Sequence, residues 1–498
     1  MMLEFLTWIF LAIYIVCSLL LMVYGLHCYL MLFLFLVRQK HSRAQLHLQI
    51  ETYNSDCPTT ARPLVTIQLP IYNEAEVVER LLESAAAVDY PRDRLEIQVV
   101  DDSSDETREL IDRIVPRLQK RGVDISVLRR ADRKDFKAGA LAMAMQKAKG
   151  EFVAIFDADF LVPSHFLRHT LALIDGHPDV ACVQGRWGHL NIDENWLTRA
   201  QSVGINGHFA AEQGARSYNR LCMNFNGTAG LWRASAIHEA GGWQGDTLTE
   251  DLDLSYRVQL LGQRIVYDFD LECLAEIPNN VIALKSQQKR WAKGSIETAI
   301  KLGPTILHSH RLSLFQKVEA MVHLTHYMVA PLMLVLSACT LPVLVLAPNL
   351  PVSGLVAGIW LFIIISALAP CVMYTGSGLV LRRGFFSLSH FPAMLAVGTG
   401  LCLNNSLAVW EAICKKRSPF IRTPKSGSDP RQSRQGRYRL PTDCWPAYCE
   451  IGLGIYCLYT FFYYLESEKY IFGFFIASYA VGLITFGLAS VKERAAHT

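Results

Sequence analysis

The sequence lacks the signatures of several common functional classes. Among its 498 residues there is no Gly-x-Gly-x-x-Gly fingerprint, no Walker phosphate loop and no internal repeat. The 13 cysteines form no Cys-x-x-Cys pair, which argues against a zinc site or a disulfide framework and suits a reducing compartment. A net charge of +3 gives no electrostatic basis for nucleic acid as a partner.

Charge is missing altogether from one long N-terminal segment. Residues 5–37 contain no Asp, Glu, Lys or Arg. At about 1.5 Å per residue, a helix of this length more than spans a ~30 Å hydrocarbon core. Since no small-residue cleavage site follows, we expect residues 1–45 to form a transmembrane anchor rather than a cleaved leader.

Apolar segments return after a charged central region. Residues 60–310 have the mixed composition and alternating strand and helix patterns of a soluble α/β domain. Within 311–498, the segment 385–413 is apolar but contains polar side chains such as Asn404 and Glu411, so we expect it to lie on the membrane surface. Further spans are expected near 322–346, 354–378, 446–465 and 470–491.

The positive charges indicate how the spans are oriented. Lys and Arg follow the first, third and last expected spans, and they also fill the loop 415–439. Positive charge therefore gathers on the side that carries the central domain. We predict five spans, an outside amino terminus and a cytosolic central domain.

Two aspartates follow an apolar run in the central domain. Residues 152–156 are typical of a buried parallel strand, and Asp157 and Asp159 come directly after it. Ligands of open α/β sheets bind beyond the carboxyl ends of the strands. Two carboxylates at that place suit a divalent cation that in turn binds a diphosphate. Because Asp-x-Asp is common, its meaning depends on the other motifs.

Two upstream motifs allow a ligand-binding interpretation and a purely structural one. Asp101 and Asp102 end a second strand, where they could accept hydrogen bonds from a nucleotide, although Asp102 or Ser103 could equally cap the next helix. Lys137 lies in a Gly-containing segment and could meet a phosphate, or it could be an ordinary exposed lysine.

Three downstream motifs likewise do not show, one by one, whether their role is structural or functional. The small-residue turn around Asn226 indicates only close packing. Thr249 is expected to cap a helix with Glu250 in its first turn, whereas Asp251 could also act as a base toward an attacking hydroxyl. Gln287-x-x-Arg290-Trp291 joins a guanidinium that can bind diphosphate to an indole that can stack on a sugar, or it is a surface pair.

Taken together, these motifs resemble the family 2 processive glycosyltransferases of the cellulose synthase superfamily. The chain is most similar to the cellulose synthase-like A group, the glucomannan 4-β-mannosyltransferases, and to its bacterial relatives. The resemblance implies an α/β GT-A glycosyltransferase domain inserted between transmembrane α-helices. It rests on the order of four motifs, the three acidic ones and Gln-x-x-Arg-Trp. It also rests on the segments 137–141, 156–160, 225–233 and 239–243.

The resemblance also implies a role for each motif. Asp251 would be the general base, and Asp157 and Asp159 would bind Mg²⁺ or Mn²⁺ and position the diphosphate. The substrate-binding residues would be Tyr72, Asp101, Asp102, Lys137, Asp157, Asn226, Glu250, Gln287, Arg290 and Trp291.

A further match lies in the segment 415–430. Phe420, Thr423 and Lys425 resemble the Phe-x-Val-Thr-x-Lys gating loop of cellulose synthases, with Arg422 in place of the usual Val. These three residues would contact the substrate. A basic cytosolic loop that binds anionic lipid is the alternative.

The expected function is polymerisation of hexose from GDP-mannose or UDP-glucose into a β-linked polysaccharide that is extruded across the membrane. Its partners would be the donor, the growing chain and membrane lipids, with a second copy or an accessory export subunit left open. A bacterial inner membrane is favoured over a Golgi membrane. Single transfer to a ceramide-like or polyprenyl phosphate lipid is the alternative. A transporter or scaffold is disfavoured, since all the acidic motifs are intact.

Overall fold

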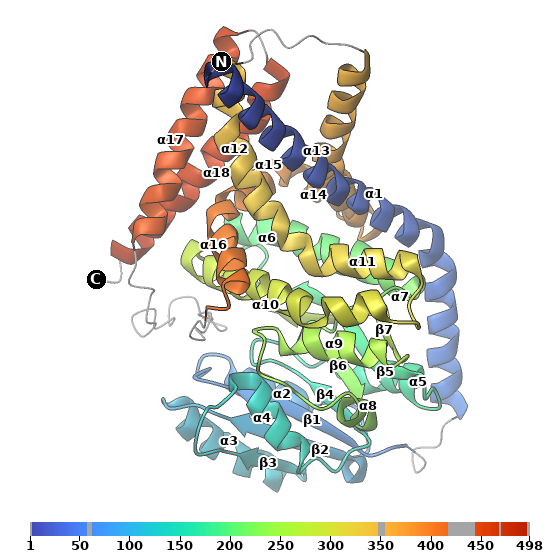
Figure 1. Cartoon of the computed structure of the whole chain (residues 1–498). Coiled ribbons are helices and arrows are strands. Elements are labelled where there is room, and N and C mark those ends of the chain that lie inside the picture. Colours follow the sequence, from blue (N-terminus) through green and yellow to red (C-terminus); the bar gives the residue numbers. More distant parts are fainter. Residues whose placement is uncertain (1, 57–61, 347–353, 417–443, 468–469, 496–498) are drawn as a thin grey trace.

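A computed structural model describes residues 2–56, 62–346, 354–416, 444–467 and 470–495. Apolar helices from both ends of the chain gather at one end of the molecule, and a mixed sheet with its covering helices forms the other (Figure 1). This arrangement agrees with the predicted α/β domain placed between apolar helices.

The central domain is built on one seven-stranded sheet in the order β3-β2-β1-β4-β6-β5-β7. Strand β6 runs antiparallel to both neighbours, and the other pairs are parallel. The predicted strand after Gly150 is confirmed as β4, which is fully buried, as its continuous apolar sequence requires. The strands are β1 Val65–Ile71, β2 Leu95–Asp101, β3 Ile125–Leu128, β4 Phe152–Ile155, β5 Val180–His189, β6 Gly230–Arg233 and β7 Arg264–Ala275.

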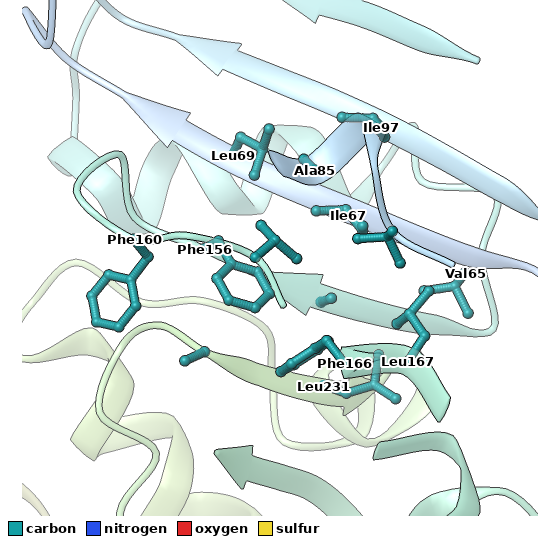
Figure 2. Close-up of a cluster of buried hydrophobic side chains, with 14 of the residues drawn as sticks. Val65, Ile67, Leu69, Ala85, Ile97, Phe156, Phe160, Phe166, Leu167 and Leu231 are labelled. Carbon is teal, nitrogen blue, oxygen red and sulfur yellow. The ribbon is translucent and has the colours of Figure 1, made fainter. Parts of the chain in front are cut away.

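Helices cover both faces of the sheet, and each face has its own core. On one face Phe156 and Phe166 meet edge-on with ring centroids 4.7 Å apart, among the apolar side chains of β1 and β4 (Figure 2). On the other face, Phe35 from the N-terminal helix packs beside Tyr218 and Phe269. The helices of the domain are α2 Val78–Ala86, η2 Arg92–Arg94, α3 Thr107–Lys120, α4 Phe136–Met145, α5 Phe166–Ile174, α6 Trp196–Asn206, the π-helical η3 Gly207–Gln213, α7 Gly214–Tyr218, α8 Ala234–Glu239 and α9 Glu250–Leu260.

Helix α1 is one continuous helix, Met2–Asp56, that joins the apolar end of the molecule to the sheet domain. Beyond the expected span, Arg43 forms a two-pronged ion pair with Asp270, at 3.0 Å for Nε–Oδ2 and 2.5 Å for Nη2–Oδ1. Tyr53 donates to the Asp175 carboxylate at 2.7 Å. The helix thus continues beyond the expected membrane anchor 1–45 and reaches the sheet domain.

Among the residues that the structure describes, the C-terminal part consists of helices and short connections, without a strand. Its elements are α10 Val281–His308, α11 Leu314–Thr325, η4 His326–Met328, α12 Val329–Leu346, α13 Gly354–Val380, α14 Gly384–Ser389, α15 Phe391–Gly400, α16 Cys402–Ile413, α17 Trp445–Glu466 and α18 Tyr470–Ala495. Glu493 of α18 accepts hydrogen bonds from the first two backbone N–H groups of α10, at 2.9 Å each. The last helix of the chain thus caps the helix that contains Arg290 and Trp291.

The structure has four or five candidate membrane spans, against the five predicted, and their identity differs in part. Within the described ranges, four stretches are long and apolar enough to cross a membrane, namely Met2–Asp56, Leu314–Leu346, Leu361–Val380 and Gly473–Ala495. A fifth span arises if α15 and α16, bent by 42° to each other, count as one. That pair lies in the segment expected to be interfacial. The expected span 446–465 forms α17, which packs on α18 but is less apolar than these four.

We predict that Ile67→Ala destabilises the folded protein by about 2–5 kcal/mol. Ile67 is fully buried in β1, at the centre of the sheet, so its loss leaves a cavity. Leu48→Ala is the matched control, because Leu48 is 65% exposed on α1. Thermal unfolding of both variants in detergent measures the difference. Equal melting temperatures would contradict this view of the core.

Candidate active site

A cavity of about 1570 Å³ opens at the carboxyl ends of β1, β2 and β4. This is the place where open α/β sheets bind ligands. Loops after these strands meet the start of α9 and the middle of α10 around it. It brings together most of the predicted site residues, namely Tyr72, Asp102, Lys137, Asp157, Asp159, Asn226, Glu250, Asp251, Gln287, Arg290 and Trp291.

Of the predicted site residues that the structure describes, Asp101 is not part of this lining. Asp101 is 2% exposed, accepts from Arg129 Nε at 2.7 Å and accepts from the Ser103 backbone N–H at 2.9 Å, so it stabilises the end of β2. Phe420, Thr423 and Lys425 lie outside the described residues.

Two arginines that the sequence did not single out hold Asp102 and Tyr72 in place. Arg130 binds both oxygens of Asp102, at 2.8 Å for Nε–Oδ1 and 2.6 Å for Nη2–Oδ2. The guanidinium of Arg133 lies 3.2 Å from the ring centroid of Tyr72, a cation–π contact. The basic run 129–134 just before Lys137 was the available signal for these residues.

Lys137 is the central cation of the acidic cluster. Its Nζ lies 2.5 Å from Asp157 Oδ1 and donates to the Gly227 carbonyl at 2.9 Å. Burial alone would lower the pKa of Lys137, but the charges of Asp157 and Glu250 outweigh it and raise the pKa above its usual range. The alternative of an exposed surface lysine is therefore wrong.

The carboxyl groups at the start of α9, Glu250 and Asp251, are partly buried. Burial, and secondarily the charge of Glu250, raises the pKa of Asp251 to about 7. Burial also raises the pKa of Glu250. The predicted cap is wrong, since the Thr249 side chain makes no capping hydrogen bond and instead faces Thr298 at 3.4 Å between the two hydroxyl oxygens.

The small-residue turn after Asn226 allows Asp251 to approach. Gly227 has φ +83, and a Cβ added there would lie 2.8 Å from Asp251 Oδ2. The hydroxyl of Thr228 accepts from the Asp157 backbone N–H at 2.9 Å, which ties the turn to the end of β4. The turn therefore links the Asp-x-Asp motif to Asp251, a connection that its sequence alone did not indicate.

A row of polar side chains, partly buried at first and fully buried at Arg216 and Glu319, leads away from Asn226. His208 Nε2 lies 3.1 Å from Asn226 Nδ2, and its Nδ1 lies 2.8 Å from Glu212 Oε2. Arg216 comes within 3.6 Å of Glu212 and binds Glu319 of α11 at 2.9 Å. The π-helical turn η3 contains His208 and Glu212, and such turns are frequent at functional sites.

Arg290 and Trp291 lie on α10, across the cavity from the strand ends. Burial lowers the pKa of Arg290, while the charges of Glu250 and Asp157 favour its charged form. The Trp291 and Trp187 ring centroids are 6.5 Å apart, and Trp187 stacks on Phe209 at 4.8 Å. The sequence did not indicate a role for Trp187, because a tryptophan is an ordinary residue in a long strand such as β5.

His189 is a second cavity residue that the sequence did not indicate. Its Nε2 lies 3.2 Å from Asn206 Oδ1, and burial lowers its pKa to about 4. The imidazole is consequently neutral at neutral pH. Together with Trp187, it extends the cavity wall from the acidic cluster along the end of β5.

The candidate metal donors are Asp157 and Asp159. Within the described parts of the chain, no group of three or more His, Cys, Asp or Glu side chains is arranged to hold a metal ion. Two carboxylates in one cavity fit a cation whose remaining ligands come from a bound diphosphate or water. One of the two, Asp157, is already paired with Lys137.

Comparison with known proteins identifies the central domain. Residues 62–294 match the family described as "Glycosyltransferase like family 2". Glucomannan 4-beta-mannosyltransferase 7 of Arabidopsis thaliana is 39% identical over 266 residues, which is 53% of this chain and 48% of that protein. Glucomannan 4-beta-mannosyltransferase 1 of Oryza sativa subsp. japonica is 38% identical over 265 residues, 52% of this chain and 51% of that protein. The chain thus spans about half the length of these curated relatives.

A solved structure supports the fold assignment. The mannosyltransferase PcManGT from Pyrobaculum calidifontis, solved with GDP-Man and Mn²⁺, superposes with a TM-score of 0.51 at 19% identity, over 80% of this chain and 100% of that one. At this identity the likeness concerns the fold. Residues 62–294 are therefore a GT-A-like domain of glycosyltransferase family 2.

Proposed function

We propose that this protein is an inverting hexosyltransferase that adds sugars from a nucleotide-sugar to a growing β-linked polysaccharide and extrudes it across the membrane. The observation that carries the proposal is one cavity whose lining brings Asp251, a carboxyl group with a raised pKa, together with the Asp-x-Asp pair and Arg290. The names of the related glucomannan mannosyltransferases, and the GDP-Man bound to PcManGT, favour GDP-mannose over UDP-glucose as donor.

The donor would lie along the strand ends. Tyr72 and Asp102, braced by Arg133 and Arg130, would contact the base and ribose. Lys137 would lie beside the diphosphate, which Asp157 and Asp159 would hold through a divalent cation. When bound, Mg²⁺ or Mn²⁺ would neutralise negative charge on the diphosphate.

Transfer needs one displacement at the anomeric carbon. Asp251 takes the proton from the terminal hydroxyl of the acceptor, and that oxygen forms a bond to C1 of the donor sugar. The bond from C1 to the diphosphate oxygen breaks, and the electron pair leaves with the nucleoside diphosphate. Arg290 stabilises the departing charge. Attack from the opposite side inverts an α-linked donor to a β-linked product.

The acceptor would occupy the side of the cavity toward the apolar helices. Trp291 and Trp187 offer aromatic faces on which a sugar ring can stack, with Gln287 beside them. The cavity of about 1570 Å³ exceeds the usual volume of a single-ligand pocket and has room for donor and acceptor together. Transfer to a ceramide-like or polyprenyl phosphate lipid is the second candidate, and the first experiment below separates the two.

We place the domain in the cytosol, in a bacterial inner membrane protein. Lys415 and Lys416 belong to the basic segment after α16 and line the cavity, so positive charge and catalytic domain share a side. A second copy or an export subunit would be a further partner.

The first test is transfer of radiolabel by purified membranes supplied with GDP-mannose or UDP-glucose. We expect an ethanol-insoluble polymer that β-glycanase digests, and a loss of about 10²-fold or more in Asp251→Asn, which cannot accept the proton. Asp193→Asn is the control, since the Asp193 side chain is 80% exposed. Label confined to the organic phase would indicate a lipid acceptor, and full activity in Asp251→Asn would exclude it as the base.

The second test is the pH dependence of kcat/KM. Because the pKa of Asp251 is raised to about 7, the group is protonated and inactive at lower pH, so kcat/KM should rise through about pH 7 to a plateau. Glu250→Gln removes a charge that raises this pKa and should move the midpoint to lower pH. A midpoint that stays in place in Glu250→Gln would contradict the electrostatic coupling of the two groups.

The third test concerns the turn beside Asp251. Gly227→Ala should lower kcat by about tenfold or more, because the new methyl group displaces the Asp251 carboxylate. Gly176→Ala has similar backbone strain, with φ +71, but nothing within 4 Å of the added carbon. Steady-state rates of the two purified variants give the comparison. Equal losses would mean that backbone strain, rather than contact with Asp251, causes the effect.

A further inference from the structure

Helix α10 contains charged residues at every fourth position. Lys285, Lys289, Lys293, Glu297 and Lys301 form this row, which we call the α10 stripe. With 3.6 residues per turn, each step of four turns the row by about 40° around the helix. The row therefore winds from one side of α10 to another and can reach two different groups of partners.

The first half of the α10 stripe binds the C-terminal helices. Lys285 Nζ lies 2.5 Å from Glu450 Oε2 of α17, and Lys289 Nζ lies 2.8 Å from Glu411 Oε1 of α16. Lys293, buried at 1% side-chain exposure, donates to the backbone carbonyl of Lys416. These contacts fix α10 relative to the apolar end of the molecule.

The second half binds the loop that leads into α9. Glu297 Oε2 accepts from the backbone N–H of Leu248 at 2.9 Å. Lys301 Nζ binds Asp246 Oδ1 at 2.7 Å and Asp253 Oδ1 at 2.9 Å. Leu248 directly precedes Thr249, and Asp253 follows Asp251 by two residues. The stripe thus holds the chain on both sides of Asp251.

We call these contacts of Glu297 and Lys301 the clamp. Close packing between α10 and the residue before α9 strengthens it. A Cβ added to Gly294 would lie 2.5 Å from Thr249 Cγ2 and 2.6 Å from Thr249 Oγ1, so only glycine allows α10 to come this near. Burial raises the pKa of Glu297. A carboxyl group is costly to bury without a partner, and the Leu248 N–H supplies one here.

We propose that Glu297 and Lys301 are positioning residues that set the place of Asp251 through the 244–249 loop. The inference rests on the proposed function of Asp251 as the base. Glu297 and Lys301 hold the loop by hydrogen bonds and ion pairs, whereas the donor-side residues Tyr72 and Asp102 lie on other elements. Loss of the clamp therefore acts on the chemical step and leaves donor binding unchanged.

The kinetic test compares Glu297→Ala with Glu297→Gln in the purified full-length protein. We expect Glu297→Ala to lower kcat by about tenfold with the donor KM within about twofold, because the base is misplaced. Glu297→Gln should restore most of kcat, since an amide oxygen still accepts from Leu248. Lys301→Met should show the same split between kcat and KM. Equal loss in the Ala and Gln variants, or a rise in KM instead, would overturn the proposal.

Hydrogen exchange tests the same clamp without any assay of transfer. Exchange of the peptide 244–253 should be faster in Glu297→Ala than in the wild type and unchanged in Glu297→Gln. Unchanged exchange in Glu297→Ala would overturn the proposal. If the wild type transfers no sugar from either donor, the proposed function fails, while hydrogen exchange still decides whether Glu297 holds the loop.

Discussion

The structure depends on the neutralisation of a crowded acidic cavity. Asp157, Asp159, Glu250 and Asp251 line the same cavity, and like charges held close together with limited access to water repel each other. Two cations oppose this repulsion, Lys137 from α4 and Arg290 from α10. They come from segments far apart in the sequence, so the acidic cluster can exist only when the domain is fully folded.

The same balance explains why the cluster is suited to chemistry. A carboxyl group that is largely withdrawn from water, but not paired directly with a cation, has a raised pKa, as Asp251 does. Asp157, in contrast, has its own ion pair with Lys137. One cavity thus holds an aspartate that is paired with a lysine and another that has a raised pKa.

The sequence predicted the strand-end acids and the α10 residues because each lies next to a strong local pattern. It could not separate Asp101 from Asp102, although the sheet register does: Asp101 pairs with Ile71 as the last residue of β2 and points into the structure, and its neighbour points the opposite way. Arg130 and Trp187 were missed because their importance comes from partners distant in the chain. The cap assigned to Thr249 failed because α10 approaches it closely at Gly294.

Helix α1 has a mechanical consequence. Its 55 residues form one unbroken helix of about 80 Å, anchored to the domain by the Arg43–Asp270 pair and by Tyr53. Phe35 of the same helix sits inside the second core of the domain. A single unbroken helix therefore joins the sheet domain to the apolar end of the molecule. Any change in the position of the domain relative to the apolar end would have to bend this helix or break its contacts through Arg43, Tyr53 and Phe35.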